Sequence, residues 1–331
     1  MPTRLTLAID AGLILPDQGD IIVFHPRADA DLDPLPRDAC RIVQPMRPDH
    51  DAFAARGIRT APTADPQARA ALSLVCVPRA KALARALVAT AASLTDGMVA
   101  VDGAKTDGID SLLRDIRKRV QVFGPVSKAH GKLFWFDAGT AAGTFDDWLP
   151  PETQEVDGFC TAPGVFSADG IDPASQLLVS HLPEHPGAHI ADLGAGWGYL
   201  SAQLLRDPKL QSLHLVEADH AALECARANV ADPRATFHWA DVLDWTAPGP
   251  IDAVVMNPPF HKARAADPGL GIGFIETAAR ILSARGHLWL VANRHLPYEQ
   301  ALSARFAQIE EIAGDNRFKV LHAARPSRPR R

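Results

Sequence analysis

The sequence is poor in the residue patterns that form metal centres and covalent cross-links. It has four cysteines in 331 residues, and no two of them form a C-x-x-C pair. Scattered cysteines of this kind argue against a zinc site and a disulfide framework, and they are typical of a reducing cytoplasm. The 13 histidines show no metal-ligand spacing such as H-E-x-x-H, so we expect no metal.

Long apolar runs and a strong excess of charge are also missing. No apolar run reaches the roughly 18 residues of a membrane span, and the N-terminus is a poor signal peptide. The net charge of -5 argues against a chain coated in nucleic acid, although it is compatible with a local basic surface. We therefore expect a protein without a membrane partner and, from its length, about two domains.

The sequence contains the same rhythm of strands and helices twice. In the C-terminal half, apolar runs predict strands at 188–193, 212–216, 253–256, 287–292 and 318–322, the last of them antiparallel. Helical stretches lie between them at 199–206, 220–230 and 272–282. In the N-terminal half, strand-like runs at 21–24, 41–43, 74–77, 98–101 and 132–136 follow in the same order, with a helix at 50–56. This alternation predicts two parallel α/β domains.

A segment rich in small residues, prolines and acids separates the halves at 139–158. We place one domain at 1–145, a second at 158–324, and a basic, disordered tail at 325–331. A repeat this long favours a duplicated domain. The alternative is that any two doubly wound domains look alike at this level.

A glycine-rich turn follows the first strand of the C-terminal half. The strand ends in Asp192, three alternate glycines follow at Gly194, Gly196 and Gly198, and a helix begins. Glycine permits positive φ and close approach of a ligand. The spacing is G-x-G-x-G rather than the dinucleotide G-x-G-x-x-G, and no P-loop lysine is present. This pattern favours adenosine carrying a short charged chain, as in S-adenosylmethionine (SAM), over a structural tight turn.

Acidic residues stand at the ends of the next strands. Glu217 is placed to accept the ribose hydroxyls of a nucleoside, and Asp219 is a nearby competitor with a helix-start role. Asp241 is a candidate acceptor for the adenine amine, with a helix N-cap as the alternative. Asp192 is suited to hold the glycine turn and, through water, the ammonium of the methionine part.

A buried strand then runs into Asn257, Pro258, Pro259 and Phe260. Prolines cannot donate to the sheet, so the ladder stops there and a stiff loop displays the amide and the ring. The Asn257 Oδ1 atom and the Pro258 carbonyl can accept the two hydrogens of an exocyclic amine and aim its lone pair. Phe260 can stack on a base taken out of its helix. The alternative is a rigid proline turn.

These motifs resemble those of the amino-methylating class I SAM-dependent methyltransferases. Residues 164–172, 175–178, 291–298 and 317–320 further resemble the ribosomal RNA small-subunit guanine-N2 methyltransferases. The resemblance implies two homologous Rossmann-like methyltransferase domains, an N-terminal one without SAM motifs, and methylation of a guanine 2-amino group in the 16S rRNA of the 30S subunit. It places Phe166 and Ser167 over the cofactor. The predicted SAM contacts are thus Phe166, Ser167, Asp192, Gly194, Ala195, Gly196, Gly198, Glu217, Ala218, Asp241, Val242 and Asn257.

The N-terminal half differs where this chemistry would take place. It has His25-Pro26-Arg27 in place of the glycine turn, and we align Val77-Pro78-Arg79 with the segment that begins at Asn257. If the halves are duplicates, the first has lost its cofactor site. The family resemblance implies that its role is RNA recognition or support of folding.

Basic residues cluster in the N-terminal half. We take them as candidate phosphate contacts, with a solvated helix face as the alternative. They are Arg79, Lys81, Arg114, Arg117, Lys118, Arg119, Lys128 and Lys132.

Two other functions remain open from the sequence. One is another planar nitrogen target: a large-subunit rRNA guanine, an adenine N6 or a glutamine amide. The other is a non-catalytic RNA-binding assembly factor. Because the chain supplies its own second domain, we expect a monomer.

Overall fold

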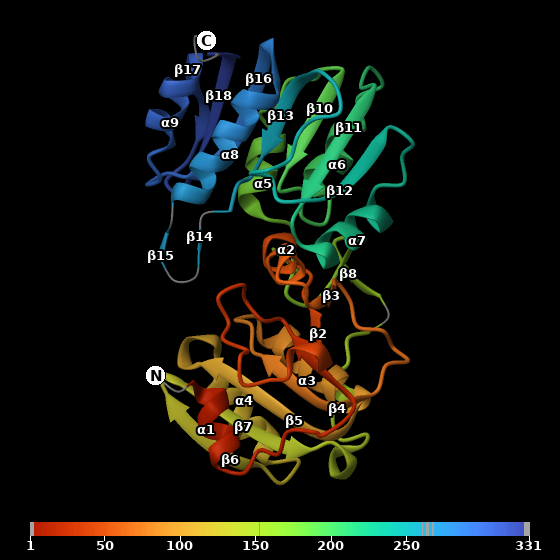
Figure 1. Ribbon diagram of the computed structural model, residues 1–331. Helices are drawn as coiled ribbons and strands as arrows, with labels where there is room; N and C mark the ends of the chain where they lie inside the picture. The colour runs from red at the N-terminus through yellow and green to blue at the C-terminus, as the bar shows by residue number, and fades with distance from the viewer. Residues whose placement is uncertain (1–2, 152, 260, 263–264, 267, 328–331) are drawn as a thin grey trace. The chain divides into compact units, whose positions relative to one another are not determined.

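The computed structural model of the protein describes residues 3–151, 153–259, 261–262, 265–266 and 268–327. Its contacts divide the chain into two compact units, residues 1–153 and 154–331. Each unit is built on one seven-stranded sheet with helices against it (Figure 1). Among the described residues, no helix is both long and apolar enough to cross a bilayer.

The sheet of the first unit has the strand order β3-β2-β1-β4-β5-β7-β6. The strands β1 to β5 run parallel, β7 is antiparallel to β5, and β6 is antiparallel to β7. The strands are β1 (Asp20–Phe24), β2 (Cys40–Val43), β3 (Arg59–Ala61), β4 (Ala70–Cys76), β5 (Thr95–Ala104), β6 (Phe123–Lys128) and β7 (Gly131–Asp137). The helices are α1 (Arg4–Asp10), α2 (Arg47–Ala55), α3 (Lys81–Leu94) and α4 (Ile109–Arg117).

The sheet of the second unit has the order β12-β11-β10-β13-β16-β18-β17, which repeats the first order strand for strand. The strands are β10 (His189–Leu193), β11 (Ser212–Glu217), β12 (Ala235–Trp239), β13 (Ile251–Met256), β16 (Leu282–Asn293), β17 (Phe306–Gly314) and β18 (Phe318–Pro326). The helices are α5 (Pro173–Val179), α6 (Tyr199–Leu204), α7 (His220–Asn229), α8 (Pro268–Ile281) and α9 (Tyr298–Arg305). Two short hairpins complete it: β8–β9 (Gln154–Val156, Phe159–Thr161) and β14–β15 (His261–Lys262, Ala265–Ala266).

This architecture confirms the prediction of two tandem Rossmann-like α/β domains, including the antiparallel last strand. Sequence reasoning missed the edge strands β3, β6 and β17. The reason is plain for β17, in which only Phe306 is fully buried. An edge strand with two polar faces lacks the apolar run that marks a central strand.

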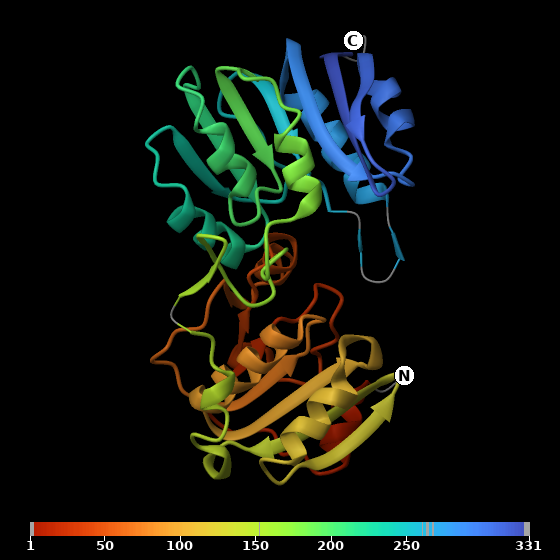
Figure 2. The same cartoon turned by 180° about the vertical axis from the view of Figure 1, so that it is seen from behind.

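Helices cover both faces of each sheet. In the second unit, Figure 1 views the face under α8 and α9, and Figure 2 the face under α5 and α6. In the first unit, α1 and α2 pack on one face and α3 and α4 on the other. The apolar residues of the central strands alternate between the two cores: Ala191 and Leu193 face α8, while Ile190 faces α5 and α6. This alternation determines to which face of the sheet each side chain near a strand end points.

The unit boundary and the tail differ from the predictions. The first domain was predicted to end at 145, yet Trp148 is buried in the first core against Phe145, with their rings 5.1 Å apart. The tail was predicted to be disordered from Arg325. Strand β18 instead continues to Pro326, which pairs with Phe306, because β17 offers it a partner. Residues 328–331 of the predicted tail lie outside the described residues.

Close packing between α8 and α9 gives a test of this fold. A Cβ added at Gly271 in α8 would overlap the phenol oxygen of the buried Tyr298 in α9. We expect Gly271→Ala to destabilise the protein by about 1–3 kcal/mol, because an overpacked core must shift its backbone. The measurement is urea unfolding of the variant and the wild type.

The matched control is Gly249→Ala, at an exposed position where a Cβ meets no atom within 4 Å. It should change the unfolding free energy by no more than about 0.5 kcal/mol. Equal stability of Gly271→Ala and wild type would contradict the packing of α8 on α9.

Candidate active site

The glycine turn joins β10 to α6 at the carboxyl edge of the second sheet. All three of its glycines have positive φ: 74° at Gly194, 55° at Gly196 and 90° at Gly198. A Cβ at Gly194 would lie 3.1 Å from the Phe274 ring, and one at Gly198 would lie 3.1 Å from Val230. These two glycines thus serve close packing. A Cβ at Gly196 would meet nothing within 4 Å, so its backbone faces open space where a ligand can approach.

Glu217, at the end of β11, supports the turn. One carboxylate oxygen accepts a hydrogen bond from the backbone N–H of Gly196 at 2.8 Å, and the other accepts one from Asp219 at 2.8 Å. Burial raises the pKa of Glu217 to about 6. Asp219 accepts from the backbone N–H of Ala221 as the N-cap of α7, which is the helix-start role that the sequence suggested for it.

Asp192 is a buried acid with one oxygen unused. Its Oδ2 accepts a hydrogen bond from the Ser201 hydroxyl at 2.7 Å, and among the described residues its Oδ1 has no hydrogen-bond partner. Burial raises the pKa of Asp192 to about 7. A buried carboxylate with an unpaired oxygen is costly, so this atom marks a place where a cation or a bound water belongs.

Asn257 follows β13 on the strand next to β10. Its Nδ2 donates to Asp172 Oδ2 at 2.9 Å and to the Ser175 hydroxyl at 2.9 Å. Pro258 is buried and Pro259 is exposed. The predicted stacking residue Phe260 lies outside the described residues.

One cavity is lined by both the glycine turn and Asn257. Of the predicted residues, the structure brings Phe166, Ser167, Gly194, Ala195, Gly196 and Asn257 to its wall. Sequence reasoning missed five others: Asp172, Ser175, Trp197, Tyr199 and Leu200. Asp172 and Ser175 could have been found from the start of a helix. An Asp that precedes a Pro at the first helical position is typical of an N-cap, and its side chain bonds to a residue of the first turn.

Other predicted cofactor contacts lie outside the cavity wall. Within the described part of the chain, these are Asp192, Gly198, Glu217, Ala218, Asp241 and Val242. Asp241 accepts a hydrogen bond from the backbone N–H of Leu243 at 2.9 Å. Residues 242–244 form a turn and not a helix, so Asp241 is not the helix N-cap of the alternative prediction. Val242 is buried in the core.

Phe166 lines the cavity and also meets solvent. It is 56% exposed, which is unusual for a phenylalanine, and its carbonyl accepts a hydrogen bond from the Trp197 indole at 2.9 Å. The adjacent Ser167 has a φ of 55°. The strained loop is thus tied to the glycine turn through Trp197 and holds an apolar ring beside the space that Gly196 leaves open.

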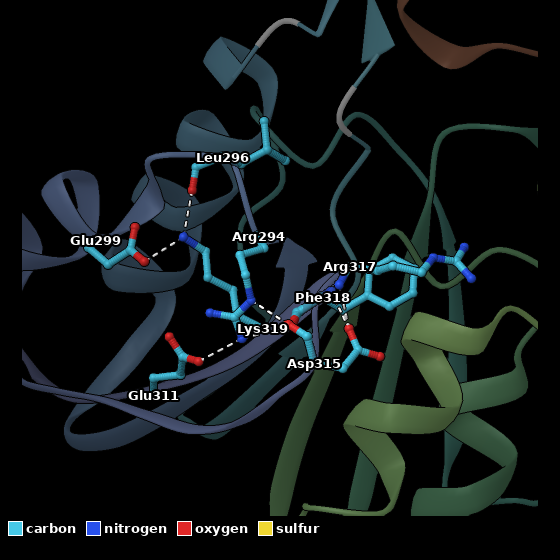
Figure 3. Close-up of polar contacts among 8 residues, drawn as sticks. All are labelled: Arg294, Leu296, Glu299, Glu311, Asp315, Arg317, Phe318 and Lys319. Atoms are coloured by element: carbon cyan, nitrogen blue, oxygen red, sulfur yellow. Dashed lines mark hydrogen bonds and ion pairs between the residues drawn. The ribbon is translucent and has the colours of Figure 1, made fainter.

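The loop after β16 is fixed by polar contacts (Figure 3). The buried Lys319 of β18 donates to the Leu296 carbonyl at 2.7 Å and pairs with Glu299. Arg294 pairs with Glu311 at 2.9 Å. These contacts give a structural reason for the motifs at 291–298 and 317–320, because they hold the strand-end loop beside the one that carries Asn257.

The equivalent edge of the first unit is built differently. Residue 25 matches residue 194 in topology: His25 donates from its backbone to Val43, and Gly194 donates to Val216, both at 2.8 Å. His25 keeps the positive φ, at 59°. Between β1 and β2 no α-helix corresponds to α6, although residues 25–39 are all described. The glycine turn and its helix are therefore both absent there.

The register corrects our alignment of the two halves by one residue. Phe24 pairs with Val75 as Leu193 pairs with Met256. Cys76, rather than Val77, thus stands at the position of Asn257. The error arose because the prolines were matched in the sequence without knowledge of the strand pairing.

The basic residues of the first unit fall into two groups. Arg119 forms a bidentate pair with Asp147, at 2.5 and 2.8 Å, and its guanidinium lies 4.6 Å from the Trp148 ring centre. Lys132 pairs with Asp110 at 2.6 Å, and Lys81 lies 3.8 Å from Asp115. Lys128 is half-buried. Arg79 is exposed, as are Arg114, Arg117 and Lys118 on and after α4; Lys81 and Arg119 are exposed as well, but they lie in the ion pairs named above.

Fold and site together define a Rossmann-like methyltransferase, and comparison with known proteins agrees. The family described as methyltransferase small domain matches residues 157–322. A solved structure, the T. thermophilus 16S rRNA N2 guanine methyltransferase in complex with AdoMet and guanosine, has the same fold. Its TM-score is 0.78 at 23% identity, over 94% of this chain and 90% of that one.

Curated relatives narrow the assignment. Ribosomal RNA small subunit methyltransferase C of Shewanella baltica is 31% identical over 274 residues, 79% of this chain and 78% of the relative. Ribosomal RNA large subunit methyltransferase G of Aeromonas salmonicida is 35% identical over 166 residues, 48% of this chain and 44% of the relative. The chain belongs to the family of ribosomal RNA small subunit methyltransferase C.

The residues present fit SAM, the cofactor of this class. Gly196 leaves space at the cavity where a side chain would fill it. The unpaired Oδ1 of Asp192 suits a water that links it to an ammonium group. Phe166 offers an apolar cover. When bound, SAM supplies a methyl group on a positively charged sulfur.

We predict that Asp192 makes cofactor binding dependent on pH. Burial raises the pKa of Asp192 to about 7, so at lower pH the free protein holds it protonated. Because this pKa lies above that of an unfolded Asp, the free protein should lose stability as pH rises towards 7. A cationic ligand favours the ionised acid, so affinity for SAM should increase between pH 6 and pH 8.

Calorimetric titration with SAM across this range tests the prediction. Asp192→Asn should flatten the pH dependence, whereas Asp244→Asn, at an exposed carboxylate, should keep it. A wild-type affinity that is independent of pH would contradict the assignment of Asp192.

Proposed function

We propose that this protein transfers a methyl group from SAM to the exocyclic 2-amino group of a guanine in 16S rRNA. The observation that carries the proposal is the amide of Asn257, held at the edge of the cavity with both of its hydrogens used. Membership of the small-subunit methyltransferase C family supports the RNA target. The described complex of a relative of the same fold with AdoMet and guanosine supports the cofactor and the base.

In this mechanism the chain positions an amine rather than activating it by proton transfer. The two acceptors are Asn257 Oδ1 and the Pro258 carbonyl, which follow one another at the end of β13. By accepting the two amine hydrogens, they draw the nitrogen out of plane and direct its lone pair. Positioning of this kind can supply much of the barrier reduction in a transfer between two bound groups.

A large-subunit guanine is the second candidate target. It is favoured by one observation, the 35% identity to ribosomal RNA large subunit methyltransferase G. That match covers 48% of the chain, whereas the small-subunit relative matches 79%. The longer match includes the unit that lacks the glycine turn, and we therefore prefer the small subunit.

We further propose that the first unit is a degenerate methyltransferase domain that recognises RNA. His25 and Cys76 replace the two residues that a catalytic unit needs at this edge. The exposed cations Arg114, Arg117 and Lys118 supply phosphate contacts. We propose a cytoplasmic monomer, since rRNA is its substrate and one chain carries both functions.

The test of the proposed function uses tritiated SAM with 30S subunits, 50S subunits and total tRNA from cells that lack the protein. We expect label in the 30S RNA that digests to N2-methylguanosine. Asn257→Ala should lower the single-turnover rate by about 100-fold or more, because the amine loses a fixed acceptor.

Label only in 50S subunits or tRNA would overturn the target while keeping the reaction. SAM binding without transfer to any of the three RNAs would favour a protein substrate or a non-catalytic assembly factor. A full rate in Asn257→Ala would remove the proposed role of that side chain.

The RNA surface predicts a salt-dependent effect of charge. Arg117→Glu reverses an exposed charge on α4, and we expect it to weaken binding to 30S subunits and to reduce the dependence of affinity on salt. Binding is measured by filter retention at several salt concentrations. The control, Arg285→Glu, makes the same charge change at the exposed start of β16, opposite the catalytic edge. Equal loss in both variants would contradict a specific surface on α4.

A further inference from the structure

We propose that Asp172 and Ser175 are positioning residues that fix the orientation of the Asn257 side-chain amide. The inference rests on the proposed function, in which Asn257 Oδ1 accepts a hydrogen of the target amine. It adds two residues to the reaction that neither touch the amine nor follow from the N-P-P-F motif.

Hydrogen-bond chemistry determines which way the amide faces. An ionised carboxylate accepts hydrogen bonds and cannot donate them. Asp172 Oδ2, 2.9 Å from the Asn257 amide, therefore selects its nitrogen. The Ser175 hydroxyl, also at 2.9 Å, takes the second hydrogen. With both hydrogens engaged, Oδ1 is the one part of the amide left to meet a substrate.

The two partners are themselves fixed. Asp172 is the N-cap of α5, and its Oδ2 also accepts the backbone N–H of Ser175 at 2.7 Å. Pro173 occupies the first helical position, and Leu178 is fully buried in the core beneath the helix. The helix start thus holds two acceptors in place before any ligand arrives, which is the preorganisation that a positioned catalytic group requires.

The first unit has a capped helix at the position that corresponds to α5, but its cap residue is not an acid. Its helix α1 also precedes the first central strand, and its N-cap Thr3 accepts from the backbone N–H of Thr6, three residues on. The hydroxyls of Thr3 and Thr6 bond to each other at 3.0 Å. Cys76 stands where Asn257 stands in the second unit. Both units therefore have a side-chain cap at this helix start. The cap is the carboxylate of Asp172 in the second unit, which has Asn257, and the hydroxyl of Thr3 in the first unit, which has Cys76.

The chemical consequence is specific to the amide. If it turned by half a rotation about χ2, its NH₂ group would face the target amine, and two donors would meet. Each hydrogen bond that prevents this turn is worth about a factor of 10 in the rate of a step that needs the correct orientation.

Four variants separate this role from helix capping. Asp172→Thr keeps a side chain that caps α1 in the first unit, but it is too short to reach Asn257. Asp172→Asn retains an oxygen for both contacts. Ser175→Ala removes one of the two acceptors. Ser180→Ala is the matched control, since Ser180 ends the same helix and bonds to the Leu177 carbonyl.

Single-turnover rates are measured with tritiated SAM and unmethylated 30S subunits. We expect Asp172→Thr and Ser175→Ala to lower the rate about tenfold, with little change in the concentrations of SAM or subunit needed for half saturation. Asp172→Asn should recover most of the rate lost in Asp172→Thr, and Ser180→Ala should match wild type. A lowered affinity for SAM at an unchanged rate would overturn the proposal in favour of a direct cofactor contact.

A double-mutant cycle with Asn257→Ala separates the proposal from the function on which it rests. If the clamp acts through Asn257, adding Asp172→Thr to Asn257→Ala should cost nothing more. Additive losses would overturn the clamp and leave the role of Asn257 intact. A full rate in Asn257→Ala alone would overturn the proposed function instead.

Hydrogen exchange of the Asn257 side chain tests the clamp without catalysis, and it can be used if the methylation rates of the variants are too low to measure. The side-chain amide protons of Asn257, assigned by their loss in Asn257→Ala, should exchange with water faster in Asp172→Thr than in wild type. Unchanged exchange would overturn the clamp whatever the rates.

Discussion

The site depends on the parallel pairing of β10 with β13. In this register Leu193 lies beside Met256, so the residues that follow, Gly194 and Asn257, leave the sheet at the same edge. Parallel strands place their carboxyl ends together, and ligands bind there in open α/β sheets. The glycine turn then provides the space, and Asn257 provides the group that faces it. The glycine turn and Asn257 form one site because their two strands are neighbours in the sheet.

Two further layers of contact convert this edge into a defined site. Glu217 supports the turn from β11 through the backbone of Gly196, and α5 supports the amide from the other side through Asp172. Both supports are acidic side chains that accept from N–H groups. The two acids therefore shape the loops at this edge of the sheet.

The first unit has the same strand order without these supports. It keeps the strand order and the positive φ at residue 25, yet it has no counterpart of α6 and carries Cys76 in place of the amide. At its edge Arg4 pairs with Asp102 at 2.5 Å. The two units thus share a strand order and differ in the residues at the strand ends, because the cores beneath the strands are independent of those residues.

Much of the second unit, including its central strands and the motifs at their ends, could be predicted from local patterns in the sequence. Gly194, Gly196 and Asn257 each interrupt a strand pattern in a way that has few structural explanations. Contacts between distant segments could not be predicted: Asp172 and Asn257 are 85 residues apart, and no periodicity links them. The basic residues show the same limit, since Arg119 pairs with Asp147, which lies 28 positions further along the chain. Strand register, which corrected Val77 to Cys76, is likewise a property of the paired sheet.

Calorimetric titration of the full chain with SAM, for wild type and Gly196→Val, tests the central claim most directly. The claim is that one edge of one unit binds the cofactor, against a backbone that no side chain covers. It predicts one SAM per chain in wild type and loss of binding in the variant, whose side chain would fill the space above residue 196. Two SAM molecules per chain, or undiminished binding by a folded Gly196→Val, would contradict it.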